Sequence, residues 1–521
     1  MSRTWVIPDV AERDYDRLPS IWWCVVAFII IQTAGILITV LTWEQGKPVM
    51  SGLFFVRALL MPLLVWGAVC GIIYSGYEDS IGCADWWNFL CRSAHVDWRY
   101  WTQAHVAIVR SIALTPEPEL AERLLGLEGS PPANPGAVLS LPAVDGAAGV
   151  SRLSLIVEQL LTPFVSSVSR LAQSRTVEVI LQSAAKDDLT ELRTVWQKLN
   201  LSDLVQFGWL PCDAGHTRIE TWFEEGWSAD FRLLVACQLH EEDAEPSWSE
   251  AAVAMLLTRP SVIDSFKGKL RPQARLFRPI PTPADSVEES LGTLLAAGQT
   301  PRARIRNGWL GGLSPQGRHA VTGAVRESGL DLQVHDLDCA TGRPGPVSPL
   351  LLQALAAQMV AHGQGTQLVA APAGQRLTLN LVGVNPSPVP EVEPPYMRML
   401  SLSVTAGVSC VLVLMMFLLE AAGASPAWFW MCMSGFFLMF LIQAGGSILR
   451  RRLLDDDFRR ALWRSGARAL VSVSERDLWR EIEHRCRTRN TAPAPIPAAS
   501  SGPLSCCSRP PPCSSPEDLR R

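Results

Sequence analysis

Two pairs of long apolar runs, one pair near each end of the chain, constrain this sequence more than any other feature. At the C-terminal end, Leu400–Leu419 and Trp428–Leu449 are each about 20 residues long, enough to cross roughly 30 Å of hydrocarbon as helices. At the N-terminal end, Ile21–Trp43 and Leu53–Tyr74 form the second pair. The sequence therefore predicts two transmembrane α-helical hairpins, at 21–76 and 400–449, with most of the chain between them.

Basic residues after the last run indicate how the hairpins face. Arginines follow Leu449 directly and recur over the next 20 residues: Arg450, Arg451, Arg452, Arg459, Arg460, Arg464 and Arg468. The turn Glu420–Pro426 contains no Lys or Arg. Because Lys and Arg accumulate on the cytoplasmic side of membrane spans, we expect the N-terminal tail 1–20, the central segment and the C-terminal tail to be cytoplasmic. The Ala-, Arg-, Leu- and Pro-rich style indicates a bacterium, so the expected location is the inner membrane, with four spanning helices.

Arg57 and Pro62 interrupt the second apolar run. Arg57 lies near the start of its run, where its side chain can reach the interface. The alternative is a charge in a conduction pathway, which would need acidic partners inside the spans, and none is visible. A proline such as Pro62 kinks a membrane helix but is tolerated there. A transporter or channel subunit is therefore the weakest of three functional hypotheses.

Residues 77–150 are expected to contain a juxtamembrane segment and the start of a soluble domain. Tryptophan is dense in Asp85–Leu90 and Val96–Trp101, with charges between the rings. This pattern is typical of a segment lying at the membrane surface, or of the first packed edge of a soluble domain. Gly129–Ala148, rich in Gly, Pro and Ala, is expected to be a loop.

The segment 151–384 alternates helical and strand patterns and predicts a cytoplasmic α/β domain with a layered sheet. The expected helices are Leu153–Leu171, Asp187–Leu199, Ile219–Glu225, Ser249–Leu257, Val287–Ala297, Ala320–Ser328 and Pro349–His362. The expected strands are Val177–Leu181, Arg232–Leu239, Leu332–Leu337, Gln367–Ala371 and Arg376–Val384, the last two joined by a hairpin turn at Pro372–Gln375.

The C-terminal third contains three further segments. Residues 385–399 form a stiff, Pro-rich linker into the second hairpin. Residues 450–490 are basic and amphipathic, with Asp455–Cys486 predicted as a pair of helices. Residues 491–521 are rich in Pro, Ala and Ser and are predicted to be disordered.

Composition excludes several classes of protein. The formal net charge is -4, so no broad basic surface suggests nucleic acid as a partner. The 13 cysteines include no CxxC pair, so the sequence indicates neither a zinc site nor a disulfide framework. No metal ligand set and no cofactor motif is evident. The expected partners are membrane lipids and other membrane or cytoplasmic proteins.

Two stretches resemble the thiolase/β-ketoacyl-synthase superfamily. Cys212 lies about 20 residues before the apolar strand at Leu233–Leu239, as a ketosynthase nucleophile precedes its helix and strand. Thr341–Pro346, the helix Leu350–Ala361 and two closing strands are similar to the end of a ketosynthase domain. The resemblance covers about 40% of the chain and includes no diagnostic motif. It implies a thiolase-like fold for the α/β domain.

The chemistry that this resemblance would imply is incomplete in the sequence. Such an enzyme needs two histidines beside its cysteine, but the matching segments, Arg306–Gly312 and Thr341–Pro346, contain none. His362–Thr366 is similar to the superfamily's His-Gly-Thr-Gly-Thr string, yet Gly363 is placed to cap a helix. Cys212 and His216 remain as a weak catalytic pair. The resemblance thus predicts a degenerate copy without a working site.

Three other stretches were considered as sites. His335–Asp338 could supply metal ligands, although alternation on a half-exposed strand explains the pattern equally. Gly308–Gly317 lacks the order of a phosphate-binding loop and predicts a turn before a helix. Asp455–Asp457 is expected to be a solvated run beside Arg450–Arg452, whose charges suit anionic lipid headgroups.

The leading hypothesis is a non-catalytic, membrane-anchored adaptor of a bacterial envelope machine, with a type VI secretion system as a candidate setting. The second hypothesis is a membrane-bound enzyme that uses Cys212 for acyl transfer on lipid-linked substrates. The third is the transporter or channel subunit.

Overall fold

A computed structural model describes residues 4–44, 46, 48, 51–143, 149–202, 204–212, 219, 221–224, 227–240, 245–396, 400–423, 425 and 427–490, with the backbone alone at 221, 224 and 467–490. The chain divides into two units, 1–462 and 463–521. The predicted disorder of 491–521 and the candidate His216 lie outside the described residues. The fold below is that of the first unit, apart from the continuation of the last helix to Asn490.

Within the described residues, four helices are long and apolar enough to cross a membrane, as the sequence predicted. The first is α1 (Ile21–Leu41) and the second runs without a break through α2 (Gly52–Phe55), a π-helical turn (Val56–Leu60) and α3 (Met61–Thr102). The third is α14 (Leu402–Ala421) and the fourth is the start of α15 (Ala427–Asn490).

One prediction about the membrane-flanking segments is wrong. The Trp-rich stretch at 85–101, for which two alternatives were open, is part of α3, which continues to Thr102 and ends against the soluble domain. In contrast, 455–486 is not a pair of helices but part of the single helix α15. No Gly or Pro interrupts either juxtamembrane stretch strongly enough to end a helix, so both spans continue beyond the apolar run.

Glycine allows α3 and α14 to pack closely. A Cβ on Gly71 would lie 2.6 Å from the Gly407 Cα, and a Cβ on Gly67 would lie 2.7 Å from the Cys410 Sγ. Small residues four apart let helix backbones approach, which is the usual basis of helix association in membranes. At the N-terminus of α14, the Ser401 and Ser403 hydroxyls donate to the Glu78 carboxylate of α3 at 2.6 and 2.7 Å.

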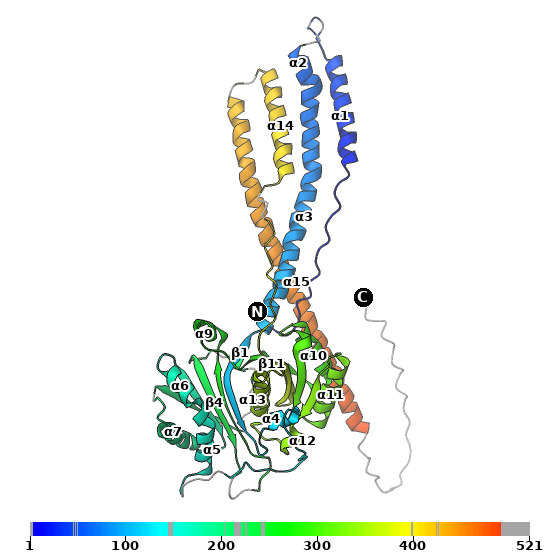
Figure 1. Ribbon diagram of the computed structural model, residues 1–521. Helices are drawn as coiled ribbons and strands as arrows, with labels where there is room; N and C mark the ends of the chain where they lie inside the picture. The colour runs from blue at the N-terminus through cyan, green and yellow to red at the C-terminus, as the bar shows by residue number, and fades with distance from the viewer. Residues whose placement is uncertain are drawn as a thin grey trace, which may run out of the picture. The chain divides into compact units, whose positions relative to one another are not determined.

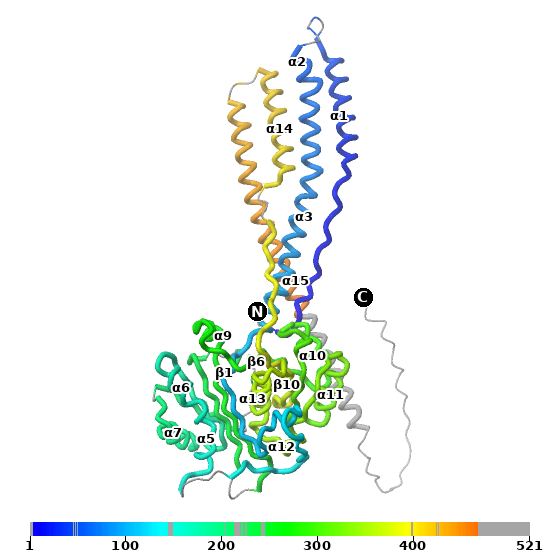
Figure 2. The backbone as a smooth tube through the Cα atoms, in the orientation of Figure 1, coloured from blue at the N-terminus to red at the C-terminus, as the bar shows by residue number. Residues whose placement is uncertain are grey.

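The N-terminal segment forms a strap, residues 4–20, along α3 (Figure 2). The Trp87 indole donates to the Ala11 carbonyl (3.0 Å), Arg13 and Asn88 exchange hydrogen bonds, and the Tyr15 hydroxyl donates to Asp85 (3.0 Å). Trp87 also packs edge-on against Phe458 of α15, 5.5 Å between ring centroids. The part of α3 that continues beyond its apolar run therefore forms a stalk together with α15 and the strap.

A single sheet of 11 strands forms the soluble domain, in the order β3-β2-β4-β5-β1-β6-β11-β10-β8-β9, with β7 paired to β11. The strands are β1 (His105–Leu114), β2 (Val177–Ser183), β3 (Val205–Pro211), β4 (Phe231–Gln238), β5 (Ala251–Thr258), β6 (Ala274–Phe277), β7 (Ile280–Thr282), β8 (Ile305–Leu310), β9 (Gln333–Asp336), β10 (Thr366–Ala373) and β11 (Arg376–Gly383).

The two halves of this sheet repeat one topology. In the first half, the chain order β2, α7 (Asp188–Lys198), β3, α8 (Thr221–Glu224), β4, β5 gives the spatial strand order β3-β2-β4-β5. In the second half, the chain order β8, α11 (Pro315–Glu327), β9, α13 (Ser348–Ala361), β10, β11 gives the spatial strand order β9-β8-β10-β11. In each half three strands are parallel and the last is antiparallel to its neighbour. Antiparallel pairing of β1 with β6 joins the halves. The domain is thus two copies of one βαβαββ unit.

Helices form three layers around the sheet (Figure 1). On the first half lie α5 (Arg152–Leu161), α6 (Val165–Ala172) and α7 (Asp188–Lys198); on the second lie α10 (Val287–Ala296) and α11 (Pro315–Glu327). Between the halves lies α13 (Ser348–Ala361), apolar on every side and almost fully buried, as expected of a central helix. The α/β layered sheet between two helical hairpins is confirmed.

The repeat is unequal in its central layer. The second half contributes the long helix α13, whereas α8 (Thr221–Glu224) is the helix found among the described residues of the matching connection in the first half. Ile219, Trp222 and Trp227 from this connection are buried in the same core as α13. Aromatic side chains of the first half therefore pack into the central core together with α13 of the second.

Several predicted elements need correction. Ser249–Leu257 is not a helix, because Ala251–Thr258 is the buried strand β5. Leu153–Leu171 is two helices joined by a turn at Thr162–Phe164, where Pro163 removes a backbone donor. The sequence reading missed β1, β3, β6, β7 and β8, and Gly308 lies within β8 rather than in a turn.

Candidate functional site

Cys212 follows β3 at the carboxyl end of the parallel strands. Its backbone N–H donates to the Ser183 carbonyl at 3.2 Å, and its thiol donates to the Cys237 carbonyl at 3.5 Å. The side chain is partly buried against the central core. His216 lies outside the described residues, so its relation to Cys212 remains a prediction.

His335, Asp336 and Asp338 do not form a metal site. The His335 imidazole lies 3.2 Å from the Asn307 Oδ1 and stacks on Trp309, whereas both aspartates face Arg318 at 2.7 and 3.0 Å. Burial lowers the pKa of His335 and raises that of Asp338. Among the described residues, no three His, Cys, Asp or Glu side chains are placed to hold a metal ion.

His362 and Gly363 end a helix, as predicted. The Gly363 N–H donates to Val360 (3.1 Å) and the Gln364 N–H to Met359 (3.0 Å), with Gly363 at φ 77°. These are the bonds of a left-handed glycine cap. The string His362–Thr366 is therefore structural.

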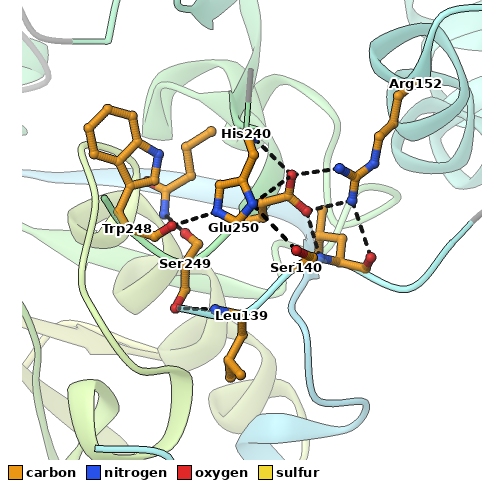
Figure 3. Close-up of polar contacts among 9 residues, drawn as sticks. Leu139, Ser140, Arg152, His240, Trp248, Ser249 and Glu250 are labelled. Atoms are coloured by element: carbon orange, nitrogen blue, oxygen red, sulfur yellow. Dashed lines mark hydrogen bonds and ion pairs between the residues drawn. The ribbon is translucent and has the colours of Figure 1, made fainter. Parts of the chain in front are cut away.

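Glu250 is the centre of a buried polar cluster that the sequence reading missed (Figure 3). Its carboxylate is fully buried and accepts from both Arg152 Nη atoms (2.7 and 2.5 Å), the Leu141 N–H (2.7 Å) and the His240 N–H (2.8 Å). The His240 Nε2 lies 2.6 Å from the Trp248 carbonyl. A buried carboxylate that accepts this many hydrogen bonds is held rigidly in place. The only signal in the sequence is an acid at the start of an apolar run.

Residues 134–141 cross the carboxyl end of the sheet as an end strap. Asn134 bonds the Cys339 and Ala340 carbonyls, the Ala137 carbonyl accepts from the Arg343 N–H (2.9 Å), and the Leu139 carbonyl accepts from the Glu250 N–H (2.8 Å). A Cβ on Gly342 would lie 2.1 Å from the Ala137 oxygen, so only glycine permits this approach. The end strap therefore ties β5 of the first half to the loop before α13 of the second.

The helices are also joined by charges at the membrane-flanking level. Arg450 and Asp79 form an ion pair at 2.5 Å, and the Trp86 indole donates to Asp455 at 2.8 Å. Arg451 lies over the Trp86 ring at 4.5 Å. The sequence predicted that Asp455 is a solvated residue. Its carboxylate instead accepts from Trp86 and so holds α15 against α3.

Comparison with known proteins gives matches among solved structures only. No protein-family model matches the sequence, and no curated protein matches it. Residues covering 54% of this chain are similar to 99% of a ketosynthase in complex with a type II PKS acyl-carrier protein, AntDE:AntF (10% identity, TM-score 0.39). The same share is similar to 98% of an OleA variant from Xanthomonas campestris (12%, 0.35) and of human mitochondrial 3-ketoacyl-CoA thiolase (9%, 0.33). The faint thiolase-like resemblance noted in the sequence is thus also found among solved structures, as a partial likeness in fold.

Proposed function

We propose that this protein is a non-catalytic adaptor that holds its α/β domain at the inner face of a bacterial inner membrane and binds other proteins there. The observation that supports this proposal is the end strap, 134–141. In open α/β sheets, ligands bind beyond the carboxyl ends of the parallel strands. Here the backbone groups of the end strap and the Glu250 carboxylate already bond to residues at that end. These contacts occupy backbone and carboxylate groups that could otherwise orient a substrate there.

The surroundings of Cys212 also favour a structural role. Its thiol donates to the Cys237 backbone carbonyl, and its side chain packs against the central core. His335 contacts Asn307 and Trp309 and, within the described part of the chain, makes no hydrogen bond to Cys212. An acyl-transfer enzyme would need a base and an oxyanion site beside the thiol.

The cytoplasmic orientation rests on the arginines that follow the last apolar run. An adaptor with four membrane helices suits an envelope machine, and a secretion system such as type VI is a candidate setting. In that setting the stalk would present the domain to cytoplasmic partners.

Acyl labelling tests the catalytic alternative directly. The purified protein is incubated with radiolabelled acyl-CoA, alongside Cys212→Ala and the matched control Cys339→Ala, which removes an exposed thiol. We expect no label that depends on Cys212. Label lost in Cys212→Ala and kept in Cys339→Ala would refute the adaptor.

Photo-crosslinking in cells tests the positive claim. A crosslinking residue at Leu204 (80% exposed) or Leu127 (51% exposed) is expected to capture one or a few discrete proteins. The same adducts should form when Cys212→Ala is introduced. Absence of any adduct from the domain surface would count against an adaptor.

A further inference from the structure

The strap, residues 4–20, connects α1 to the sheet domain by a second route besides α3. Its far end is anchored at Trp5, whose indole donates to the Pro279 carbonyl (3.0 Å) and packs edge-on against Trp101, 5.7 Å between ring centroids. Trp5 also packs against the core of the second half of the sheet. Because Pro279 lies between β6 and β7, the strap ends close to the place where the two halves are joined.

Polar contacts hold the strap along the stalk. Going from the sheet domain toward α1, successive strap residues meet α3 residues of decreasing number: Glu12 forms an ion pair with Arg92 (2.9 Å), and Asp16 accepts a hydrogen bond from Ser80. Residues 7–20 are in neither a helix nor a turn. The strap therefore runs antiparallel to α3 as an extended chain.

The length of α3 shows how far the strap must reach. At α1, the Trp66 indole donates to the Cys24 carbonyl (2.8 Å), which places these two residues at the same level. From Trp66 to Trp101 is 35 residues of one continuous helix, about 53 Å along its axis. The 16 residue steps from Trp5 to Ile21 reach at most about 53–58 Å, and three helical steps to Cys24 add about 4.5 Å. The chain therefore uses roughly 85–90% of its available length.

Two prolines keep the strap from shortening. Pro8 and Pro19 fix their own φ and disfavour the helical conformation at the preceding residues, Ile7 and Leu18. Segments with this restriction stay extended and act as semi-rigid spacers. The strap therefore has a nearly fixed length, unlike a flexible linker.

We propose that the strap is a taut tether through which the position of α1 controls whether Trp5 is docked on the sheet domain. The unused length is about 4–9 Å, so a larger movement of α1 away from the domain pulls Trp5 from Pro279 and Trp101. Arg278 lies over the same Trp101 ring at 4.4 Å, so loss of Trp5 changes the contacts where β6 ends. This device does not depend on the adaptor function.

Changing the strap length in the full chain, reconstituted in phosphatidylcholine nanodiscs, tests this proposal. The photo-crosslinking residue benzoylphenylalanine is placed at Thr4, an exposed position next to Trp5. It is expected to crosslink to the peptide that contains Pro279, with the yield measured by mass spectrometry. Deletion of Arg17–Pro19, next to α1, shortens the tether by about 10 Å, more than its unused length, and should lower this yield at least fivefold.

Two matched variants separate length from sequence. Arg17→Gly, Leu18→Ser and Pro19→Gly together change the same three residues at constant length and should keep the parent yield. In the deletion variant, insertion of Gly-Ser-Gly after Ile7 restores the total length at a distant point and should restore the yield.

Two outcomes would overturn the proposal. An unchanged crosslinking yield in the deletion variant would show that the strap has slack. A yield that falls and does not recover with the insertion would show that the loss does not depend on length. Circular dichroism of each variant confirms that it is folded, so that a lost crosslink is not lost structure.

Discussion

Single buried residues show best what the sequence could not reveal. Glu250 stands in Trp-Ser-Glu-Ala-Ala, where nothing nearby in sequence marks it, because Arg152, Leu141 and His240 come from distant segments. Cys212, by contrast, was singled out by its spacing before the strand at 233–239, and the structure places it directly after β3. The sequence predicted neither β3 nor the hydrogen bond from the thiol to the Cys237 carbonyl.

Replacing Glu250 by Gln should destabilise the domain by about 3 kcal/mol, because it leaves Arg152 and a buried N–H without their anion. Chemical unfolding followed by circular dichroism measures this loss. The matched control is Glu12→Gln, whose partner Arg92 is exposed; its unfolding midpoint should equal that of the parent. Equal midpoints for both variants would contradict the importance of the buried cluster.

His335 should make the domain acid-sensitive. Burial lowers its pKa in the folded state, so the unfolded chain binds the proton more readily and stability is lost as pH falls below about 6.5. In His335→Gln, the unfolding free energy should fall less steeply between pH 7 and 5.5, by up to about 1.4 kcal/mol per pH unit. Burial also lowers the pKa of His105, so the unfolding free energy of both proteins should still fall to some extent as the pH falls. An identical slope would show that His335 is not the sensor.

Helices and strands could be predicted from the sequence where their pattern was amphipathic. The prediction failed where an element is buried on every side. The helices at 187–199 and 287–297 have one apolar face and were found. The strand β5, Ala-Ala-Val-Ala-Met-Leu-Leu-Thr, is buried on both faces and consists largely of helix-forming residues, so neither alternation nor propensity identified it. Its neighbours β1 and β4 impose the extended conformation. That information lies in the tertiary structure.

The contact between α3 and α14 should depend on Gly71. Ala at this position would place a Cβ 2.7 Å from the Ser403 carbonyl, and the backbones must separate, at a cost of about 2 kcal/mol. Thermal unfolding in mild detergent measures the effect. Gly76→Ala meets no atom within 4 Å and should instead stabilise the same helix. Equal behaviour of the two variants would refute close packing at Gly71.

At the scale of the whole molecule, the sequence predicted the organisation more fully than the details. Hydropathy alone identified four spans, and alternation identified a layered α/β domain, because both depend on long runs rather than on single residues. The internal repeat was not detected, since its copies share topology without an evident shared sequence.

The orientation of the molecule can be tested by labelling in intact cells. In a cysteine-free background, Ser425→Cys lies in the turn between α14 and α15 and should react with a membrane-impermeant maleimide. A protein carrying only Cys339, on the exposed surface of the domain, should react only after lysis. Labelling of Cys339 in intact cells would place the domain outside and refute the cytoplasmic adaptor.

The uninterrupted helix from Met61 to Thr102 has a mechanical consequence. A helix has no soft joint along its axis, so a shift of one residue in its apolar part moves the far end by about 1.5 Å and turns it by about 100°. Trp101 and Thr102 are bonded to Arg278 and Gln299, so β6 and the adjoining loop must follow. A rotation of α3 relative to the other apolar helices would therefore apply a torque to the sheet domain at the place where its two repeated halves meet.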